Sequence, residues 1–241
     1  MVATLPPLTV YSARICPWAQ RTTLALREVG AYRDSLVEHV EIDLQNKPSW
    51  YADKVNPASK VPVLRVGAES DPSSVAIPES AVLLELVAEL FPQSKLSPED
   101  PVERAKARYF YERYTQVVGG PFGQVLYFGK SDSATISSLL SGIDEIQSLL
   151  NRTKGAFLLG DQITVGDLGV APFVGRLFAA GKAGLLPSEV YTPLSTDDKY
   201  ASFRAYHQAL TSRPSWAETF DEDYVIEFTK KRIEKTKAEQ K

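Results

Sequence analysis

The first ninety residues alternate between short strand-like runs and segments with the spacing of a helix. Runs rich in β-branched and aromatic side chains are expected to be strands, at residues 8–11, 37–42, 61–66 and 75–77. Helical patterns lie between and after them, at residues 17–29, 48–54 and 80–90. The order β-α-β-α-β-β-α predicts one mixed four-stranded sheet with helices packed on it and a parallel pairing across the first crossover.

The pattern changes after residue 91. Residues 92–101 carry three prolines and little apolar content, which indicates an exposed connection between two domains. Beyond this linker the strand signal disappears, and two helices are expected first, at residues 102–118 and 136–150. The remainder of the chain should add at least three more, at residues 165–180, 199–211 and 224–239. Gly119-Gly120-Pro121 should interrupt or end the helix expected at residues 102–118. We therefore predict an α/β domain over residues 1–91 and an all-helical domain over residues 102–241.

One helix start is specified by its polar residues. Thr164 and Asp167 have the spacing of a capping box, in which each side chain satisfies a backbone amide that the helix leaves unpaired. Ile163 and Leu168 take the positions of the accompanying hydrophobic staple. A catalytic acid at Asp167 is the alternative, but the cap accounts for both polar residues, so a structural role is expected.

Composition narrows the class of protein. The chain has 241 residues, 44% of them hydrophobic, so it can bury a sizeable core, and its net charge of −3 gives no reason to expect nucleic-acid binding. No run approaches the roughly 20 apolar residues of a membrane-spanning helix, and the start of the chain lacks the features of a secretory signal. We expect a cytoplasmic protein without a membrane partner. One cysteine cannot form an intramolecular disulfide, which agrees with a reducing compartment.

The single cysteine, Cys16, follows the first predicted strand. Pro17 is favoured at the first position of a helix, so Cys16 is the expected N-cap. Free amides and the helix dipole there favour a thiolate and a pKa below the ordinary value of about 8.5. A buried, unreactive cysteine is the alternative, but its place between strand and helix favours the reactive thiol. Ala19 stands where thioredoxin-like sites have a second cysteine, so an external thiol, such as glutathione, must resolve any mixed disulfide.

Four short motifs accompany this order of elements. They are Cys-Pro-Trp-Ala at residues 16–19, Asn-Lys-Pro-x-Trp at 46–50, Lys-Val-Pro-Val-Leu at 60–64 and Pro-Glu-Ser at 78–80. Together with the helical second half, their order and spacing resemble the omega class of glutathione transferases over nearly the whole chain. The resemblance implies a thioredoxin-like N-terminal domain, an all-α C-terminal domain and a homodimer. It implies no metal site.

The resemblance also implies roles for individual residues. Cys16 would be catalytic, a cis-Pro62 would expose the backbone of Val61 to the cysteinyl part of glutathione, and Glu79 and Ser80 would bind its γ-glutamyl group. Lys47 or Lys60 would meet the glycyl carboxylate. The full expected glutathione site is Pro17, Trp18, Lys47, Lys60, Val61, Pro62, Glu79 and Ser80. The ordinary alternatives are a trans-proline in an edge strand, a helix cap at Ser80 and solvated surface lysines.

The implied activity is glutathione-dependent thiol transfer, including deglutathionylation of mixed disulfides and glutathionyl ketones and reduction of dehydroascorbate. A small second substrate, aromatic or containing a disulfide, would lie between the domains. Trp18 would contact this substrate. Six further aromatic side chains would either contact it or belong to the core: Tyr109, Tyr111, Tyr114, Phe122, Tyr127 and Phe128. A carrier of aromatic compounds or glutathione conjugates remains open. The intact glutathione motifs argue against a third reading, a scaffold or membrane-inserting protein.

Overall fold

The computed structural model describes residues 5–240, so residues 1–4 and 241 of the two predicted domain ranges lie outside it. Its sheet has the order β2-β1-β3-β4, built from β1 (Leu8–Ser12), β2 (Val37–Glu41), β3 (Val63–Val66) and β4 (Val75–Pro78). β1 pairs with β2 in parallel and with β3 antiparallel, and β3 pairs with β4 antiparallel. The predicted mixed four-stranded sheet and its parallel first crossover are confirmed.

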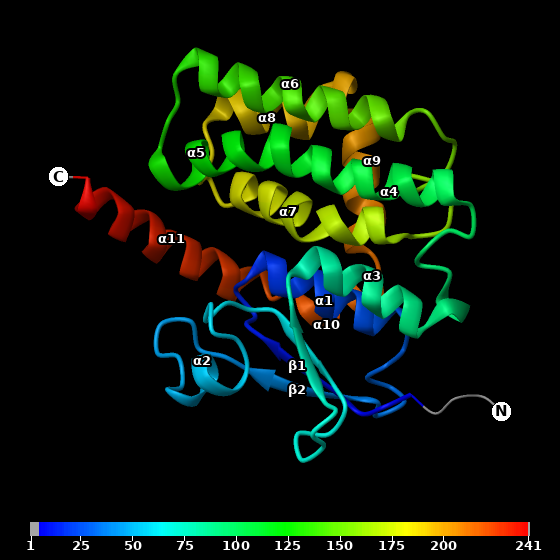
Figure 1. Cartoon of the computed structure of the whole chain (residues 1–241). Coiled ribbons are helices and arrows are strands. Elements are labelled where there is room, and N and C mark those ends of the chain that lie inside the picture. The colour runs from blue at the N-terminus through cyan, green and yellow to red at the C-terminus, as the bar shows by residue number, and fades with distance from the viewer. Residues whose placement is uncertain (1–4, 241) are drawn as a thin grey trace.

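Two helices of the first domain separate this sheet from the helical half. α1 (Pro17–Glu28) and α3 (Ser80–Leu90) pack against each other, and both contact α7 (Val165–Lys182) of the second half (Figure 1). The short α2 (Trp50–Lys54) belongs to a separate small cluster, in which Tyr51 is fully buried and packs edge-on against Tyr11 of β1. The sheet therefore has apolar packing on both faces.

The second half is helical throughout the described residues. Its helices are α4 (Pro101–Tyr114), α5 (Gly120–Phe128), α6 (Ser133–Leu150), α7, α8 (Ser188–Thr196), α9 (Ala201–Thr211), α10 (Pro214–Thr219) and α11 (Glu222–Glu239). Short 3-10 turns cover Pro92–Ser94 and Asp198–Tyr200. α7 is buried along most of its length, and α11 runs obliquely from the region of α1 across α7 to α5 (Figure 1).

The glycine pair at residues 119 and 120 does not end helical structure. A π-helical turn over Thr115–Gly119 joins α4 directly to α5, so the interruption begins before the glycines and the chain stays helical after them. Gly142 of α6 lies against this turn, where a β-carbon would stand 2.2 Å from the Val117 carbonyl oxygen. Close packing of two backbones thus stabilises a segment whose low helix propensity indicated a break. α5, α8 and α10 were not predicted.

The connection between the halves is less exposed than expected. Leu96 in its middle is 2% exposed, and its carbonyl accepts a hydrogen bond from the amide of Val165 at 2.9 Å. One apolar cluster also runs through both halves, including Leu24 of α1 and Leu168 of α7. The linker is therefore anchored to the second domain, and the two halves share a core. Within residues 5–240, no helix is long and apolar enough to cross a membrane.

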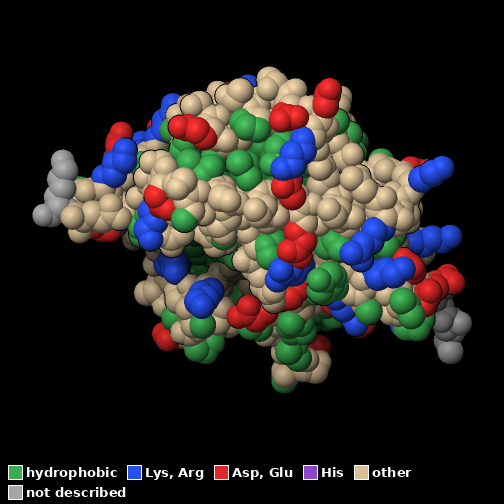
Figure 2. Space-filling view, turned by 90° about the horizontal axis from the view of Figure 1, so that it is seen from above, with side chains coloured by type: hydrophobic (Ala, Val, Ile, Leu, Met, Phe, Trp, Pro, Cys, Tyr) green, Lys and Arg blue, Asp and Glu red, His purple; other side chains and the backbone are tan. Residues whose placement is uncertain are grey.

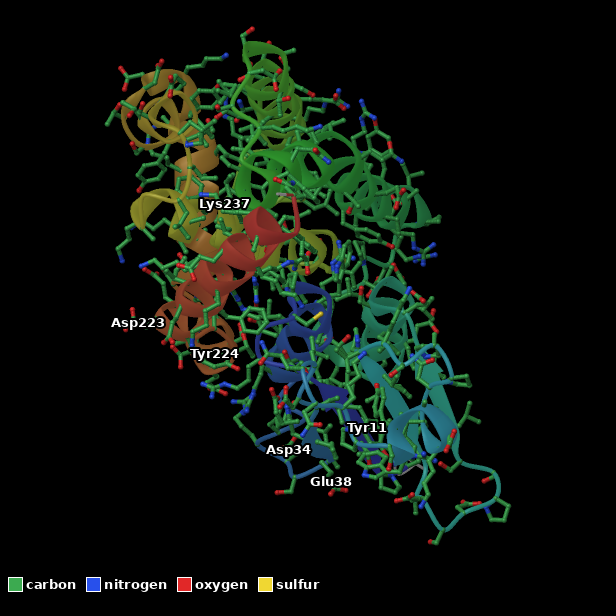
Figure 3. The ribbon with its side chains drawn as sticks, turned by 90° about the vertical axis from the view of Figure 1, so that its left-hand side faces the viewer. Tyr11, Asp34, Glu38, Asp223, Tyr224 and Lys237 are labelled. Carbon is green, nitrogen blue, oxygen red and sulfur yellow. The ribbon has the colours of Figure 1, made fainter. Side chains whose placement is uncertain are left out.

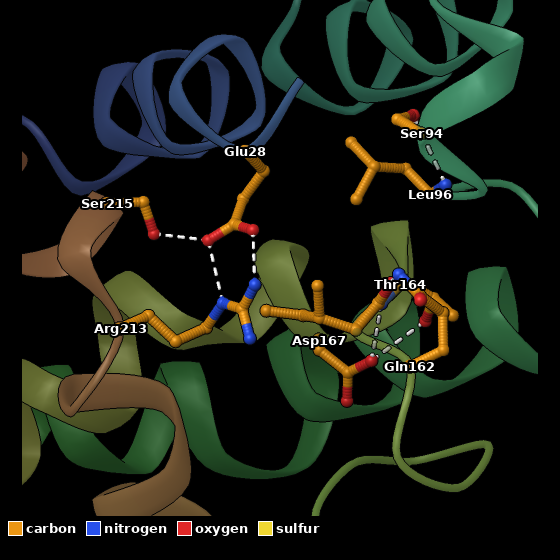
Figure 4. Close-up of polar contacts among 9 residues, drawn as sticks. Glu28, Ser94, Leu96, Gln162, Thr164, Asp167, Arg213 and Ser215 are labelled. Carbon is orange, nitrogen blue, oxygen red and sulfur yellow. Dashed lines mark hydrogen bonds and ion pairs between the residues drawn. The ribbon is translucent and has the colours of Figure 1, made fainter. Parts of the chain in front are cut away.

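The capping box at the start of α7 is present. Asp167 is fully buried and accepts hydrogen bonds from the amide of Thr164 at 2.9 Å and its hydroxyl at 2.8 Å (Figure 4). Its other carboxylate oxygen accepts from the Leu158 amide at 2.9 Å and the Tyr206 hydroxyl at 3.0 Å. Burial raises the pKa of this carboxyl above its ordinary value. Because both oxygens already bind protein donors, the contacts of Asp167 are those of a structural residue.

Candidate active site

Cys16 is the N-cap of α1, as predicted. Its backbone is extended, with φ −82° and ψ 116°, and Pro17 occupies the first helical position. The Cys16 amide donates to the Ala13 carbonyl at 2.9 Å, which fixes the turn between β1 and the helix. The amides of Trp18 and Ala19 interact with the half-buried sulfur. The helix start therefore presents its free donors to the thiol.

The expected low pKa of Cys16 is not found. Burial raises the pKa of the thiol above its ordinary value, although the amides of Ala19 and Trp18 and the positive charge of Arg176 all act in the opposite direction. The helix terminus contributes as expected, but desolvation of a thiolate at this partly closed site outweighs it. The sequence around Cys16 predicted that the residue begins a helix, but it did not predict how far the sulfur would be buried.

Arg176 of α7 is a buried cation next to this thiol. Its guanidinium donates to the Ile15 carbonyl at 3.2 Å and to the Pro172 carbonyl at 2.9 Å, and it also bonds the side chain of Gln20 in α1. Burial lowers the pKa of Arg176 to about 10, so it remains charged at neutral pH. This residue of the second domain both holds the turn before Cys16 and favours a negative charge on the sulfur.

A cavity of about 330 Å³ is lined by most of the predicted glutathione site, including Trp18, two residues after Cys16. Cys16 itself is not among its lining residues. The Val61–Pro62 peptide bond at its edge is cis, the geometry that the resemblance implied. Predicted residues that line this cavity are Trp18, Lys60, Val61, Pro62, Glu79 and Ser80. Six residues from three separate segments of the chain are thus brought together around one cavity.

Glu79 and Ser80 occupy the start of α3 despite the long loop before β4. Glu79 is the N-cap and has a φ of 75°, a conformation that non-glycine residues rarely adopt, and its side chain is exposed at the cavity. Ser80 is buried at the first helical position. A carboxylate placed here would meet a helix N-terminus and a serine hydroxyl, while Glu79 would meet an ammonium group.

Arg21 is a site residue that the sequence did not reveal. It lies one turn after Cys16, is 2% exposed and lines the 330 Å³ cavity. Its guanidinium donates to the Ser80 hydroxyl and to the Gly169 carbonyl, and it lies 4.4 Å from the ring centroid of Trp18. Burial lowers its pKa to about 10. An arginine on an amphipathic helix is usually solvated, so no local signal marked this one.

The two candidate lysines are placed differently. Lys60 lines the cavity, whereas the ammonium of Lys47 donates to the Ser59 carbonyl and Lys47 is not among the lining residues. Of the two candidates, Lys60 is therefore the one that lines this cavity. Trp50 of the same motif as Lys47 packs edge-on against Tyr11, with ring centroids 6.3 Å apart.

A second cavity of about 1020 Å³ opens between the domains and is lined by Cys16, Pro17 and Trp18. Tyr114, Phe122 and Tyr127 line it as expected, but three of the other aromatic residues do not. Tyr111 lines the smaller cavity, and Tyr109 and Phe128 are about half exposed away from both. The number of aromatic residues in a segment does not show which helix face each of them occupies, so the sequence did not separate these two groups. Phe173 and the α11 residues Phe228, Thr229 and Arg232, which line the cavity, were not predicted.

Trp18 belongs to both cavities. Its ring packs edge-on against Phe173, with centroids 4.7 Å apart, and 40% of the residue is exposed. Thr115, at the start of the π-helical turn, is the other residue that the two cavities share. The structure therefore has a smaller cavity with polar lining residues and a wider cavity that contains the thiol, and the two share Trp18 and Thr115.

Comparisons with known proteins agree with this geometry. Residues 10–95 match the model of the glutathione S-transferase N-terminal domain, and residues 133–209 match that of the C-terminal domain. Over about 70% of its length the chain is 31% identical to pyrimidodiazepine synthase of Drosophila melanogaster and to glutathione S-transferase omega-1 of Rattus norvegicus, spanning 65% and 68% of those proteins. The crystal structure of glutathione transferase Omega 1C from Trametes versicolor superposes with a TM-score of 0.85 at 35% identity, covering 96% of this chain and 98% of that one.

Proposed function

Since this chain belongs to the omega class of the glutathione transferase family, we propose that it is a glutathione-dependent thiol transferase whose nucleophile is Cys16. One observation carries the proposal. The thiol is held at the start of α1 and lines the larger cavity, which shares Trp18 and Thr115 with the cavity that has glutathione-binding chemistry. A hydroxyl at this position, as in other classes, would stabilise the thiolate of glutathione as the nucleophile; a cysteine favours disulfide exchange.

The smaller cavity matches the three parts of glutathione. Glu79, Ser80 and the start of α3 suit the ammonium and carboxylate of the γ-glutamyl group. The cis-Pro62 segment offers the backbone of Val61 to the cysteinyl part, and Lys60 suits the glycyl carboxylate. Bound in this order, glutathione runs along the edge of the sheet and its sulfur comes toward Trp18 and Cys16.

The reaction then proceeds in two exchanges. The Cys16 thiolate attacks the glutathionyl sulfur of a mixed disulfide, forming the Cys16–glutathione disulfide and releasing the other thiolate, which takes a proton from water. With a glutathionyl ketone the leaving group is an enolate, which is protonated to the ketone. A second glutathione thiolate attacks the glutathionyl sulfur, releases Cys16 and gives oxidised glutathione. Dehydroascorbate has no glutathionyl sulfur, so there the Cys16 thiolate would add to a carbonyl carbon. A glutathione thiolate would then attack the Cys16 sulfur, releasing ascorbate and forming the Cys16–glutathione disulfide, and a second glutathione would release Cys16 and oxidised glutathione.

The residues around Cys16 contribute separately to this cycle. The amides of Trp18 and Ala19 and the charge of Arg176 favour the thiolate, against the cost of burial. Ala19 offers no second thiol, so the cycle depends on a second glutathione. Because two exchanges occur at one sulfur, we expect ping-pong kinetics.

A Cys16→Ser variant tests the proposal. Wild-type protein should reduce the mixed disulfide of glutathione and 2-mercaptoethanol, while the variant should lose at least about 10³-fold in kcat/KM, because a serine hydroxyl cannot form the disulfide intermediate. Titration calorimetry should show that the variant still binds glutathione within about threefold. A wild-type protein without turnover would instead favour the alternative, a carrier that binds conjugates in the 1020 Å³ cavity. Homodimer formation stays a prediction that sedimentation analysis can check.

A further inference from the structure

The larger cavity has a marked charge composition. Resting on the proposed function, we propose that the second substrate is an aromatic compound with an acidic group, and that Arg232 of α11 is the residue that selects it. Four cationic side chains line this cavity: Arg176, Lys231, Arg232 and Lys235. Among the lining residues that the structure describes there is no aspartate or glutamate. This is opposite in sign to the net charge of −3 of the whole chain.

Positive charge is not a general property of the surface. On the face shown in Figure 2, Lys and Arg side chains are interspersed with Asp and Glu. The lining of the cavity therefore differs in charge composition from the chain as a whole, and low-dielectric walls strengthen the field of a charge that has no partner.

Three of the four cations already have partners. The guanidinium of Arg176 donates hydrogen bonds to the Ile15 and Pro172 carbonyls and to the side chain of Gln20. Lys231 pairs with Glu227 at 2.6 Å, and Lys235 lies 3.9 Å from Glu239, a looser contact. These contacts reduce the attraction of each of the three side chains for an anionic group of a ligand.

Arg232 differs from the other three. Within residues 5–240 no carboxylate pairs with it. Its guanidinium carbon lies 4.1 Å from the ring centroid of Tyr127, which also lines the cavity. The tyrosine ring positions the guanidinium while leaving its donors free, and a planar guanidinium can bind both oxygens of a carboxylate. Arg232 is therefore the cation best prepared to bind an anionic group.

The aromatic part of the ligand follows from other lining residues of the same cavity. Trp18 and Phe173 form an edge-to-face pair at the Cys16 end of the cavity. On α11, Phe228, Arg232 and Lys235 follow one another at spacings of four and three residues and share a helix face. Figure 3 shows the course of this helix, from Tyr224 near the sheet domain toward Lys237 beside the helical domain. A flat ring on Trp18 and Phe173 would direct an acidic substituent toward Arg232.

The preference can be measured by binding, apart from turnover. In the Cys16→Ser background, titration calorimetry compares 4-benzoylbenzoate with its neutral amide, 4-benzoylbenzamide. We expect the acid to bind about fivefold more tightly, because Arg232 lies at the solvent-exposed rim, where single ion pairs are modest. Arg232→Gln should remove this preference and change the affinity for the amide less than twofold. Arg232→Lys should keep part of it, and added salt should reduce it.

Lys230 provides a matched control. It is exposed on the same helix, two residues from Arg232, and is not among the cavity-lining residues. Lys230→Gln removes the same charge and should leave the preference for the acid unchanged. Equal affinity of the unsubstituted background for acid and amide, no binding of either, or an equal loss with both Gln variants would overturn the proposal.

Turnover separates this proposal from the proposed function. Wild-type kcat/KM is compared for S-(4-carboxyphenacyl)glutathione and S-(4-carbamoylphenacyl)glutathione, with the acid expected to be about fivefold better through its KM. If neither is turned over, the thiol-transferase function fails, while the binding comparison still decides the ligand preference. If both are turned over equally well, the function stands and the selectivity of Arg232 is wrong.

Discussion

The guanidinium of Arg21 donates to the hydroxyl oxygen of Ser80, with 3.3 Å between Nη1 and Oγ. A second bond from its Nε, 2.6 Å long, ends on the Gly169 carbonyl of α7, so the residue joins α1, α3 and the helical domain. Its Nη2 is buried and has no hydrogen-bond partner in the described part of the chain. Because Ser80 accepts from Arg21, its own proton is free to donate to a ligand carboxylate. Under the proposed function, Arg21 is thus a positioning residue for the γ-glutamyl group of glutathione.

Arg21→Lys should weaken glutathione binding more than it slows the exchange reaction. A lysine cannot reproduce two bonds in fixed directions, so we expect the KM for glutathione to rise about fivefold or more with a smaller change in kcat. The specific readout is 4-aminobutyryl-cysteinylglycine, which is glutathione without its γ-glutamyl α-carboxylate. Wild type should discriminate against it, and the variant should discriminate much less. Unchanged discrimination, in a variant that still melts cooperatively, would show that Arg21 acts only on stability.

The raised pKa of Cys16 predicts slow alkylation at neutral pH. Because burial favours the protonated thiol, the rate of reaction with iodoacetamide should rise with pH and reach its midpoint above the ordinary cysteine value of about 8.5. Cys16 is the only cysteine, so mass spectrometry of the adduct reports this site alone. A midpoint near 6 would mean that the helix amides dominate over burial.

Arg176→Gln tests the electrostatic part of that balance. Removing the positive charge should move the alkylation midpoint of Cys16 to higher pH, since the charge of Arg176 lowers the thiol pKa. Arg27→Gln is the matched control, because Arg27 lies on the same helix as Cys16 and its charge is not among the causes of the shift. Equal midpoints for wild type and Arg176→Gln would contradict a Coulombic role.

The sequence was most informative where local chemistry is sufficient. Pro17 marks the helix start at Cys16, Thr164 and Asp167 mark another, and alternating apolar residues mark the strands, because each signal arises within a few residues. The motifs around Pro62 and Ser80 likewise anticipated the walls of the smaller cavity. Helix boundaries shifted by a few residues, as at Glu222, where α11 begins two residues earlier than predicted.

The remaining features depend on contacts between distant segments. Arg21 meets Gly169 across 148 residues, and Arg176 reaches Ile15 across 161, so neither pairing leaves a trace in local spacing. The depth of the Cys16 sulfur depends in the same way on how the helical domain closes over α1. The aromatic residues of α4 and α5 could not be divided between core, cavity and surface, because their placement depends on which distant helix each face meets. The π-helical turn also changes the helix phase between α4 and α5.

Glu28 and Arg213 form an ion pair between the domains whose loss should destabilise the fold. The carboxylate of Glu28 at the end of α1 is 8% exposed and bonds both Arg213 and the Ser215 hydroxyl (Figure 4). Arg213→Met leaves that carboxylate without its charge partner, at a cost of about 2 kcal/mol, since Arg213 itself is partly solvated. For a chain of this size the melting temperature should fall by about 4–8 °C.

A surface ion pair gives the control for that measurement. Lys106 pairs with Glu103 at 2.7 Å, but the lysine side chain is 58% exposed, so Lys106→Met should cost less than about 0.5 kcal/mol. The two variants remove the same kind of group and differ in the burial of the acid left behind. Equal shifts in calorimetric melting temperature would mean that Glu28 is relieved by water or by another donor.

Gly142 should tolerate no β-carbon, although alanine is the better helix former. In α6 an added β-carbon would lie 2.2 Å from the Val117 carbonyl oxygen, and a backbone atom cannot rotate away as a side chain can. Gly142→Ala should therefore destabilise the protein by about 2 kcal/mol through overpacking against the π-helical turn. Gly123 of α5 has nothing within 4 Å of the same position, so Gly123→Ala should stabilise by about 0.5–1 kcal/mol in urea unfolding. Opposite signs for the two substitutions would show that the turn over Thr115–Gly119 is held by contact with α6, and equal gains would show that it is not.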